Sequence, residues 1–345
     1  MSAEARLSEL HVAVDARFAV LDARGIGRYT RSVLSRVLRA PGTRWSFVVP
    51  GLLHGSLRRQ IAAVLGVDRA AVVTAMPAGA AVLWSPSNGT DLDTAPGVRC
   101  VTTVHDATPF AYPAADMQVR ARETTPFLHT AERADLVLVQ SEFTAREAMH
   151  WLGIEPERVT VTPLGVDDSF SPGTAPPPAA AGGRPFVLHV GAHDARKNSA
   201  TLIAAHARAF PGGEIALVCT HAPPGAPKNV VVVEAPDDTA LIALYRAAAA
   251  VAVPSLYEGF GLPLLEAMAC GAPALAARAS ALAEVGGDAC AYVDAPADPD
   301  AWTEALRALL ADDGARTRLR DAGPKRARAF SWEACADATL AALHG

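Results

Sequence analysis

The chain has 345 residues, of which 50% are hydrophobic and 19% are charged, and its formal net charge is −5. This length fits two ordinary domains, and this composition is typical of a packed globular protein rather than a disordered one. The acidic balance argues against the basic surface that nucleic-acid binding requires, so we expect no nucleic-acid partner.

The five cysteines are scattered, and the sequence contains no C-x-x-C pair. This pattern indicates buried thiols in a reducing compartment rather than disulfides or a zinc site.

The N-terminus lacks the apolar run of a signal peptide, and no apolar stretch reaches the roughly 20 residues that span a bilayer. We therefore expect a cytoplasmic protein with at most peripheral contact at the inner membrane face. Residues 52–65, with Arg58 and Arg59 beside apolar side chains, are the candidate for such contact, although a solvated surface helix is the preferred interpretation.

Short apolar runs alternate with helical patterns through both halves of the chain. Strands are predicted at 11–15, 47–50, 82–85, 101–105, 136–140 and 159–162, and then at 186–190, 215–219, 230–234, 251–254 and 274–276. Helices are predicted between them, for example at 27–39, 119–133 and 142–152. Several strands are apolar at consecutive positions, as in parallel sheets covered on both faces. The order predicts doubly wound α/β domains.

A Pro/Gly/Ala-rich stretch at 171–183 has no apolar period and is interpreted as a linker. We predict an N-terminal Rossmann-like domain at 1–170 and a second one at 184–330. Two such domains would face each other across a central cleft, because ligands of open α/β sheets bind beyond the carboxyl ends of the strands. A final helix at 331–345, with Ser331 as its N-cap, is expected to pack back on the N-terminal domain.

The strongest motif is V-P-S-L-Y-E-G-F-G-L-P-L-L-E-A-M-A-C-G at 253–271. A buried strand leads into a turn that holds Glu258, and Glu266 follows in the helix after it. Gly259 and Gly261 let backbone N–H groups approach a ligand at the helix N-terminus, where anions are favoured. The alternative, that both acids are solvated residues at a helix end, fits poorly with the apolar neighbours of Glu266.

This motif resembles the E-x7-E motif of retaining glycosyltransferases with the GT-B fold, which form family 4, also called group 1. The likeness extends over the context P-S-x-x-E-G-F-G-L-P-x-L-E-A-M-A-x-G-x-P. The resemblance implies that Glu258 contacts hydroxyls of a donor sugar and that Glu266 binds the ribose of its nucleotide. It also implies that the backbone covers the sugar and phosphates through Gly259, Phe260, Gly261 and Leu262.

A second segment, G-A-H-D-A-R-K-N at 191–198, follows the predicted strand 186–190. The family grips the donor diphosphate at this loop, and Arg196 and Lys197 match its R-K-N version. Many members carry an arginine where Ala192 stands here, so which cation binds the phosphate stays open. Fixed cations would stabilise the charge that grows on the leaving diphosphate. No Asp-x-Asp motif lies beside the loop, so we expect no metal and no cofactor. The alternative is a basic start of a surface helix.

Two features of the N-terminal half are similar to family landmarks. The predicted strand 101–105 ends in His105, which the family places near the donor sugar, and a near-neutral pKa makes this residue a candidate general base as well. Its alternative is a purely structural histidine. Gly25 and Gly27 lie in a G-I-G-R-Y loop that the family places near donor phosphate and acceptor. The loop is not a dinucleotide fingerprint, because Thr30 occupies the third glycine position, and a helix-capping loop is its alternative.

The resemblance implies that the anomeric configuration of the sugar is retained. No nucleophile is evident, so we favour a front-side displacement in which the departing phosphate takes the acceptor proton, while His105 and Glu258 position the sugar. GDP-mannose is the first donor candidate and a UDP- or dTDP-sugar the second. The acceptor is a glycan, a lipid-linked glycan or a small molecule.

Four other classes compete with this interpretation. A GT-B nucleotide-sugar 2-epimerase ranks second, because it shares the fold but not the full P-S-x-x-E-G-F-G context. A NAD-dependent dehydrogenase needs the missing glycine fingerprint, and a phosphorylase needs a pyridoxal-phosphate lysine and a longer chain. A module that binds sugar nucleotides without turnover would be distinguished only by assay.

Overall fold

The computed structural model describes residues 9–22, 25–49, 54–90, 92–191, 194–222 and 230–345, and the chain divides into two compact units. Unit 1 takes in the chain up to Gly165 together with Trp332–Gly345, and unit 2 is Val166–Ser331. The stretch 171–183, predicted as a linker, therefore lies in unit 2. There the Arg246 guanidinium donates to Ser171 O at 2.9 Å, a contact that composition does not reveal.

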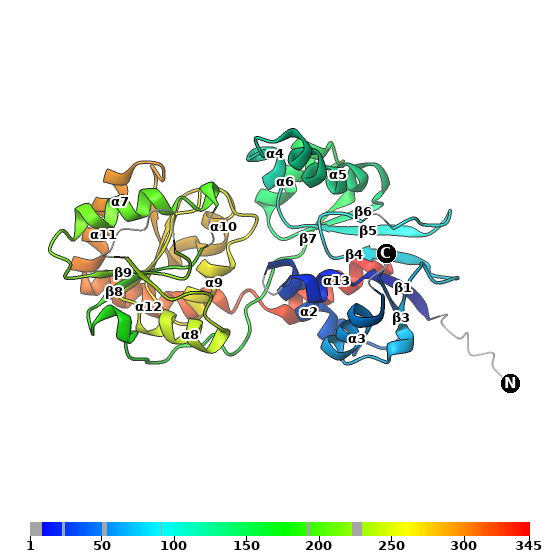
Figure 1. The fold of residues 1–345 in the computed structure, drawn as a ribbon, viewed down its shortest axis with the longest axis horizontal. Coiled ribbons are helices and arrows are strands. Elements are labelled where there is room, and N and C mark those ends of the chain that lie inside the picture. The colour runs from blue at the N-terminus through cyan, green and yellow to red at the C-terminus, as the bar shows by residue number, and fades with distance from the viewer. Residues whose placement is uncertain (1–8, 23–24, 50–53, 91, 192–193, 223–229) are drawn as a thin grey trace. The chain divides into compact units, whose positions relative to one another are not determined.

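Unit 1 is built on a seven-stranded sheet in the order β3-β2-β1-β4-β5-β6-β7, and all neighbouring strands in it are parallel (Figure 1). Its strands are β1 (Leu10–Asp15), β2 (Thr43–Val48), β3 (Val72–Val73), β4 (Val82–Ser85), β5 (Arg99–Val104), β6 (Leu136–Val139) and β7 (Val159–Val161). Its helices are α1 (Phe18–Leu21), α2 (Gly25–Val37), α3 (His54–Leu65), α4 (Thr108–Ala111), α5 (Met117–Arg133), α6 (Glu142–Leu152) and α13 (Trp332–His344). β4 and β6 are buried at every position, which explains why β6 is apolar throughout and β4 is apolar up to Ser85.

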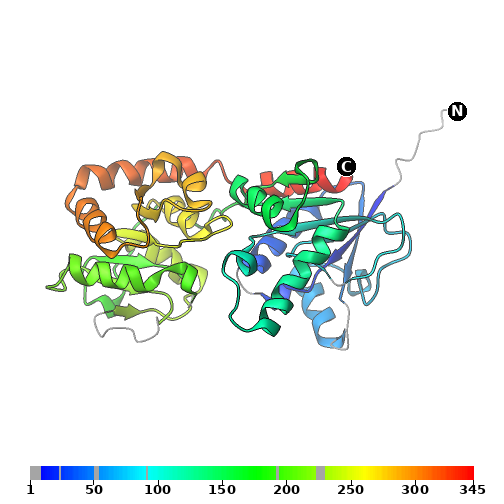
Figure 2. The same ribbon diagram turned by 90° about the horizontal axis from the view of Figure 1, so that it is seen from above.

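The C-terminal helix α13, red in Figures 1 and 2, belongs to unit 1 and packs against α2. Glu333 accepts a hydrogen bond from Arg36 Nε at 2.7 Å, and Arg99 Nη1 donates to Ala342 O at 2.8 Å. Trp332 is fully buried at the start of this helix. The last helix thus completes the core of the unit that begins the chain.

Unit 2 repeats the architecture with a six-stranded parallel sheet in the order β10-β9-β8-β11-β12-β13. Its strands are β8 (Phe186–His189), β9 (Ala216–Cys219), β10 (Val230–Val232), β11 (Ala250–Val253), β12 (Ala274–Ala277) and β13 (Ala291–Val293). Its helices are α7 (Ser199–Ala209), α8 (Asp238–Ala247), α9 (Leu262–Ala269), α10 (Leu282–Gly286), α11 (Pro299–Ala311) and α12 (Asp313–Ala327). α11 packs on α7, and α12 packs on α9 (Figure 1).

The two sheets confirm the doubly wound α/β organisation, and most of the predicted strands lie where the sequence placed them. The sequence did not predict the short edge strands β3 and β13, because a run of two or three residues carries too little pattern. The candidate surface helix at 52–65 is α3 from His54 onward, while residues 52 and 53 lie outside the described residues. Ile61 is fully buried and Arg59 is exposed, so α3 has one face toward the core of unit 1.

Four of the five cysteines agree with the prediction of buried thiols, whereas Cys100 is partly exposed. All five are free; Cys219, Cys270, Cys290 and Cys335 are buried, and burial raises the pKa of each of these four to about 12. At neutral pH these thiols are therefore protonated and inert.

We predict that Gly89→Ala destabilises unit 1, because a Cβ at this position would lie 2.1 Å from Pro126 O in α5. The backbone must shift to admit it, at a cost of about 2 kcal/mol or more. Urea denaturation measures the loss. The matched control is Gly55→Ala in α3, where an added Cβ meets nothing within 4 Å. This control should be neutral or stabilising by up to about 1 kcal/mol, and equal stability of both variants would contradict the packing argument.

Candidate functional site

The strand order of unit 2 reverses at the neighbours β8 and β11. The chain leaves β8 for β9 and β10 and then returns to add β11 on the other side of β8. Loops that follow two such strands diverge to opposite faces of the sheet and leave a crevice at its carboxyl edge. The two segments singled out from the sequence, 191–198 and 254–261, are these loops.

Glu258, in the loop after β11, is the charged centre of this edge. Its residue is only 7% exposed, and its carboxylate faces two cations from the loop after β8. Lys197 Nζ lies 2.6 Å from Glu258 Oε1, and Arg196 Nη1 lies 3.3 Å from Glu258 Oε2. The structure thus brings together three residues that the sequence assigned to one site but left 61 and 62 positions apart.

The pKa of Glu258 reflects this neighbourhood. Burial acts to raise it, but the Lys197 ammonium and the Arg196 guanidinium outweigh burial, so the pKa lies below its ordinary value. The carboxylate is therefore ionised at neutral pH. Asp194 also pairs with Arg196, so two cations and two carboxylates balance each other at this point.

Arg196 is held in place by several contacts. Asp194 caps the turn Ala195–Lys197: its Oδ1 accepts from Arg196 N at 3.0 Å, and its Oδ2 accepts from Arg196 Nε at 2.7 Å. Arg196 Nη1 also donates to Tyr257 O at 3.1 Å. The guanidinium is thereby fixed between its own turn and the loop of Glu258. The position of Ala192, where many relatives carry arginine, lies outside the described residues.

Asn198 joins the two loops, a role the sequence did not reveal. Its φ of 55° is left-handed, which asparagine tolerates better than most residues. In this conformation its side-chain amide donates to Pro254 O at 3.2 Å and to Pro296 O at 2.7 Å. Leu256 N also donates to Arg196 O at 2.7 Å. The one sequence feature that could have indicated this role is the position of Asn198 directly after Arg196 and Lys197.

Two residues with positive φ shape the surroundings of Glu258, one in the turn before α9 and one in the loop before α10. Gly261 has φ 103°, and a Cβ there would lie 2.6 Å from Leu282 Cδ2, so this position needs glycine. Ser280 has φ 51°, and its hydroxyl accepts from Glu258 N at 3.0 Å. Phe260 packs edge-on against Phe330, with ring centroids 5.6 Å apart. Its side chain therefore serves the core, and only the backbone is left for a ligand.

Glu266 lies in a different environment from Glu258. It is 6% exposed on α9, and Tyr245 of α8 donates its phenolic O–H to Glu266 Oε2 at 2.9 Å. The interpretation of Glu266 as a solvated helix-end acid is wrong, because the residue is buried. Leu262 begins the helix and is partly buried, and Gly259 is buried beside Glu258.

His189 packs beneath the loop after β8, and the sequence did not predict a role for it. It ends β8, is buried, and its Nε2 lies 2.8 Å from Ser199 Oγ while its Nδ1 lies 3.2 Å from Ala252 O. Burial lowers its pKa to about 4, so it is neutral at physiological pH. A Cβ on Gly191 would stand 3.0 Å from this ring, so the glycine lets the loop pass close over it.

In unit 1, His105 follows β5 at the carboxyl edge of the sheet. Its Nε2 lies 2.8 Å from Pro86 O, and its Nδ1 lies 3.0 Å from the side-chain amide of Gln140. A carbonyl only accepts, so Nε2 carries a proton. Burial lowers the pKa of the ring. With both nitrogens engaged by protein groups, the ring is poorly arranged to take a proton from an acceptor.

Gly25 and Gly27 lie in the first turns of α2, next to residues 23 and 24, which are outside the described part. A Cβ on Gly27 would lie 1.7 Å from Asp22 O, closer than any real contact. Gly27 N also donates to Asp22 Oδ2 at 3.3 Å. The tight return of the chain explains this glycine without a ligand, and a ligand role for it stays a prediction.

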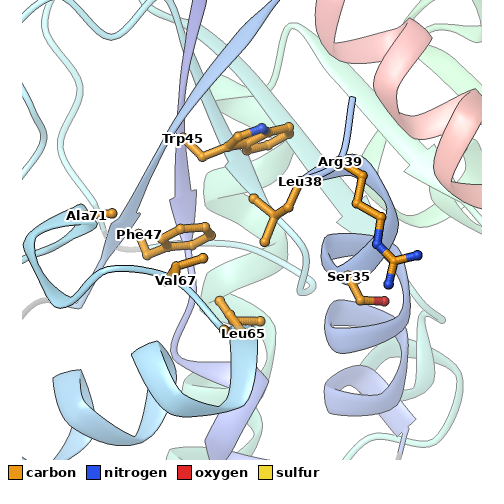
Figure 3. Close-up of a pocket in the computed structure, with 9 residues that line it drawn as sticks. Ser35, Leu38, Arg39, Trp45, Phe47, Leu65, Val67 and Ala71 are labelled. Atoms are coloured by element: carbon orange, nitrogen blue, oxygen red, sulfur yellow. The ribbon is translucent and has the colours of Figure 1, made fainter. Parts of the chain in front are cut away.

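A pocket of about 470 Å³ lies in unit 1 between α2, β2 and α3 (Figure 3). Its lining residues are Ser35, Leu38, Arg39, Trp45, Phe47, Leu65, Gly66, Val67 and Ala71. α2 and α3 contribute their C-terminal ends, which in a parallel α/β sheet lie at the amino edge, whereas ligands bind at the carboxyl edge. No residue predicted for the site lines this pocket, and we assign it no part in the chemistry.

In the described part of the chain, no three His, Cys, Asp or Glu side chains gather in a way that could hold a metal ion. No helix in it is both long and apolar enough to cross a bilayer.

The fold defines the class of protein. HepE of Anabaena, solved in complex with UDP and glucose, aligns with 97% of this chain and 99% of its own chain at a TM-score of 0.70 and 16% identity. At that identity the likeness shows the fold alone. It is the GT-B fold of glycosyltransferases, with two Rossmann-like domains, and it confirms the fold class predicted from sequence.

Sequence comparison then defines the family. The model of Glycosyltransferase Family 4 matches residues 8–170, and that of Glycosyl transferases group 1 matches residues 224–326. O-antigen chain mannosyltransferase B of Escherichia coli is 30% identical over 268 residues, which cover 70% of this chain and 69% of that protein. The MMP alpha-(1->4)-mannosyltransferase of Mycolicibacterium hassiacum is 32% identical over 246 residues, 67% of this chain but only 56% of that protein. The chain belongs to the group 1, family 4 glycosyltransferases.

We predict that Glu258→Gln lowers the unfolding free energy near neutral pH by about 2 kcal/mol, since it leaves two cations without their buried partner. The folded-state pKa of Glu258 lies below the unfolded value of about 4.3. Its stabilisation is therefore present above the unfolded value and is lost as pH falls through the folded one. Denaturant titrations of wild type and variant over this pH range measure the difference.

The control for this prediction is Asp300→Asn in the same unit. Asp300 pairs with Arg208, but both side chains are more than half exposed, so its loss should cost under about 1 kcal/mol. A Glu258→Gln penalty that does not shrink in acid would show that the loss is not one of charge.

Proposed function

We propose that this enzyme is a retaining hexosyltransferase that moves mannose from GDP-mannose to an acceptor hydroxyl, with its donor site at the carboxyl edge of unit 2. The observation that carries the proposal is the meeting of Lys197, Arg196 and the buried Glu258 at the strand-order reversal. Such an edge is where open α/β sheets bind ligands, and paired cations suit a diphosphate.

Charge balance suggests how donor binding proceeds. Before the donor arrives, Glu258 is the anionic partner of both Lys197 and Arg196. A diphosphate carries more charge than one carboxylate and presents several acceptor oxygens, so it would become the preferred partner of the two cations. Glu258, released from one or both, would then accept hydrogen bonds from hydroxyls of the donor sugar.

The same cations would act during transfer. Negative charge grows on the leaving nucleoside diphosphate as the glycosidic bond breaks, and fixed cations in a water-poor site stabilise it without reorganising. The backbone from Gly259 to Leu262 adds N–H groups at the N-terminus of α9, where the helix dipole favours phosphate. Glu266, farther along α9, is proposed to bind the ribose. The Gly25 and Gly27 loop is proposed to approach the phosphates from unit 1.

Retention is proposed to proceed by front-side displacement. The acceptor hydroxyl attacks on the side from which the phosphate leaves, so the protein needs no nucleophile, and the departing phosphate takes the acceptor proton. Glu258 and His105 then position the sugar. For His105 this role is preferred to that of general base, because both of its ring nitrogens already have protein partners.

The choice of mannose rests on the relatives, of which two are named mannosyltransferases. A UDP- or dTDP-sugar is the alternative donor, and the UDP and glucose bound by HepE favour the UDP-sugar. The acceptor is proposed to be a glycan, a lipid-linked glycan or a small molecule. The enzyme is proposed to act in the cytoplasm or at the inner face of the membrane.

The donor can be tested by thermal unfolding against a panel of GDP-, UDP- and dTDP-sugars. A ligand at 100 times its Kd should add about 2.7 kcal/mol to the unfolding free energy. We expect GDP-mannose to stabilise most. Nucleoside monophosphates serve as controls that keep base and ribose but lack the diphosphate. If no sugar nucleotide stabilises the protein, the proposal is wrong; if a UDP-sugar does so best, only the donor assignment is wrong.

We predict that Lys197→Ala lowers kcat by about 10²-fold or more, as does the loss of other groups that stabilise charge in a transition state. Donor affinity should fall less, because the charge that Lys197 meets grows only as the bond breaks. Steady-state kinetics and direct donor titration measure the two effects. The control is Lys325→Ala on α12, an exposed lysine whose loss should leave both unchanged.

Equal losses in kcat and affinity would make Lys197 a simple binding residue, and no loss would remove it from the site.

An assay of transfer in excess EDTA tests whether Arg196 and Lys197 neutralise the diphosphate in place of a metal ion. Transfer should continue; its disappearance and recovery with Mg²⁺ or Mn²⁺ would overturn that part of the mechanism.

A further inference from the structure

Tyr245 is a fully buried polar residue that has no part in the donor chemistry proposed for this enzyme. It lies near the C-terminal end of α8, and its ring packs near that of Phe170, with centroids 6.2 Å apart. Its phenolic oxygen lies 2.9 Å from Glu266 Oε2. Tyr245 is 0% exposed, and a phenolic O–H is tolerated in the core when it makes a hydrogen bond there.

The two residues come from different helices that pack on each other, α8 and α9. Tyr245 is anchored by the next residue in the chain, since Arg246 Nε donates to Ser171 O at 2.9 Å and Arg246 Nη2 to Ser171 Oγ at 3.1 Å. The phenol is therefore a fixed donor rather than a mobile one. A glutamate side chain has three rotatable bonds, and a fixed donor on one of its oxygens restricts all of them.

The environment of Glu266 differs in kind from that of Glu258. Glu258 is held by cations, which a diphosphate can take from it, whereas Glu266 Oε2 is held by a neutral hydroxyl that does not compete for phosphate. The Tyr245 contact can persist when a nucleotide binds. A carboxylate fixed in this way presents acceptor lone pairs in a defined plane, which suits hydroxyl donors of a sugar.

We infer that Tyr245 is a positioning residue that orients the Glu266 carboxylate toward the 2′- and 3′-hydroxyls of the donor's ribose, and so makes the site selective for ribonucleotides. The inference rests on the proposed function. Its recognition element is the pair of vicinal hydroxyls, so a 2′-deoxyribonucleotide loses one of the two donors and with it a hydrogen bond to the carboxylate.

The test is calorimetric titration of wild type and Tyr245→Phe with GDP, UDP and ADP, and with their 2′-deoxy counterparts. Phenylalanine keeps the ring that packs near Phe170 and removes only the O–H. Wild type should bind its preferred ribonucleotide about tenfold more tightly than the deoxy form, the effect of one hydrogen bond to a charged group. In Tyr245→Phe this ratio should fall to about two or less, through weaker binding of the ribonucleotide.

Kinetics with the sugar donor supply a second measurement. Ribose is remote from the bond that breaks, so KM should rise about tenfold in Tyr245→Phe while kcat stays within about twofold. The matched control is Tyr292→Phe in the same unit, whose phenol donates to Gly287 O at 3.0 Å. This control removes the phenolic hydrogen bond of a partly buried tyrosine to a backbone carbonyl and should keep both the ribose preference and KM.

A double-mutant cycle separates positioning from a general effect on packing. If Tyr245 acts through Glu266, then Tyr245→Phe combined with Glu266→Ala should weaken ribonucleotide binding no more than Glu266→Ala alone. Additive losses would overturn the inference, as would an unchanged ribose preference in Tyr245→Phe. If Tyr245→Phe does not fold, Glu266→Asp provides the test, since it keeps the charge but withdraws the carboxylate from the phenol; a retained preference would overturn the inference.

The outcomes also separate this inference from the proposed function. Ribonucleotide binding that weakens in Glu266→Ala but not in Tyr245→Phe leaves the donor site standing and overturns the role of Tyr245. Failure of wild type to bind any of the nucleotides overturns the donor site itself.

Discussion

Lys197 Nζ lies 2.6 Å from Glu258 Oε1, and the two residues belong to loops that follow adjacent strands, β8 and β11. Arg196 reaches the other carboxylate oxygen, so one buried acid joins both loops. A charge this deeply buried is tolerated only when it is paired, which obliges the loops to stay together. The surrounding contacts serve that pairing: Asp194 holds Arg196, Asn198 bridges to Pro254, and Ser280 accepts from the backbone of Glu258.

The parallel sheets explain why this pairing lies where it does. Each unit has one pair of neighbouring strands at which the strand order reverses, β1 with β4 in unit 1 and β8 with β11 in unit 2. Loops diverge there and leave their backbone and polar side chains accessible at the carboxyl edge. Bringing ionic residues to this point of unit 2 keeps them out of the apolar core, while the buried strands beneath them, including Val251 and Leu188, provide a rigid base.

The two glutamates of the motif differ in what holds them, and this difference matches two tasks in handling a nucleotide sugar. Glu258 is balanced by cations, so an arriving diphosphate can alter its partners. Glu266 is bound by the neutral phenol of Tyr245, a contact that a phosphate has no reason to displace. Sequence spacing alone treats the two acids as equivalent. Their packing partners make one of them responsive to charge and the other a constant hydrogen-bond acceptor.

Local patterns in the sequence were enough to predict the parallel α/β organisation, because buried strands show as short apolar runs whatever their partners. The long motif and its glycine turns are local features too, so they were enough to mark Glu258 and Glu266 as candidate site residues, while the resemblance to the glycosyltransferase family added Arg196 and Lys197. Tertiary structure alone decided that Lys197 and Arg196 pair with Glu258, that Tyr245 holds Glu266, and that the units divide after Gly165. These contacts join residues between 21 and 62 positions apart. Such pairings arise from strand order and helix packing, which leave no periodic trace in the chain.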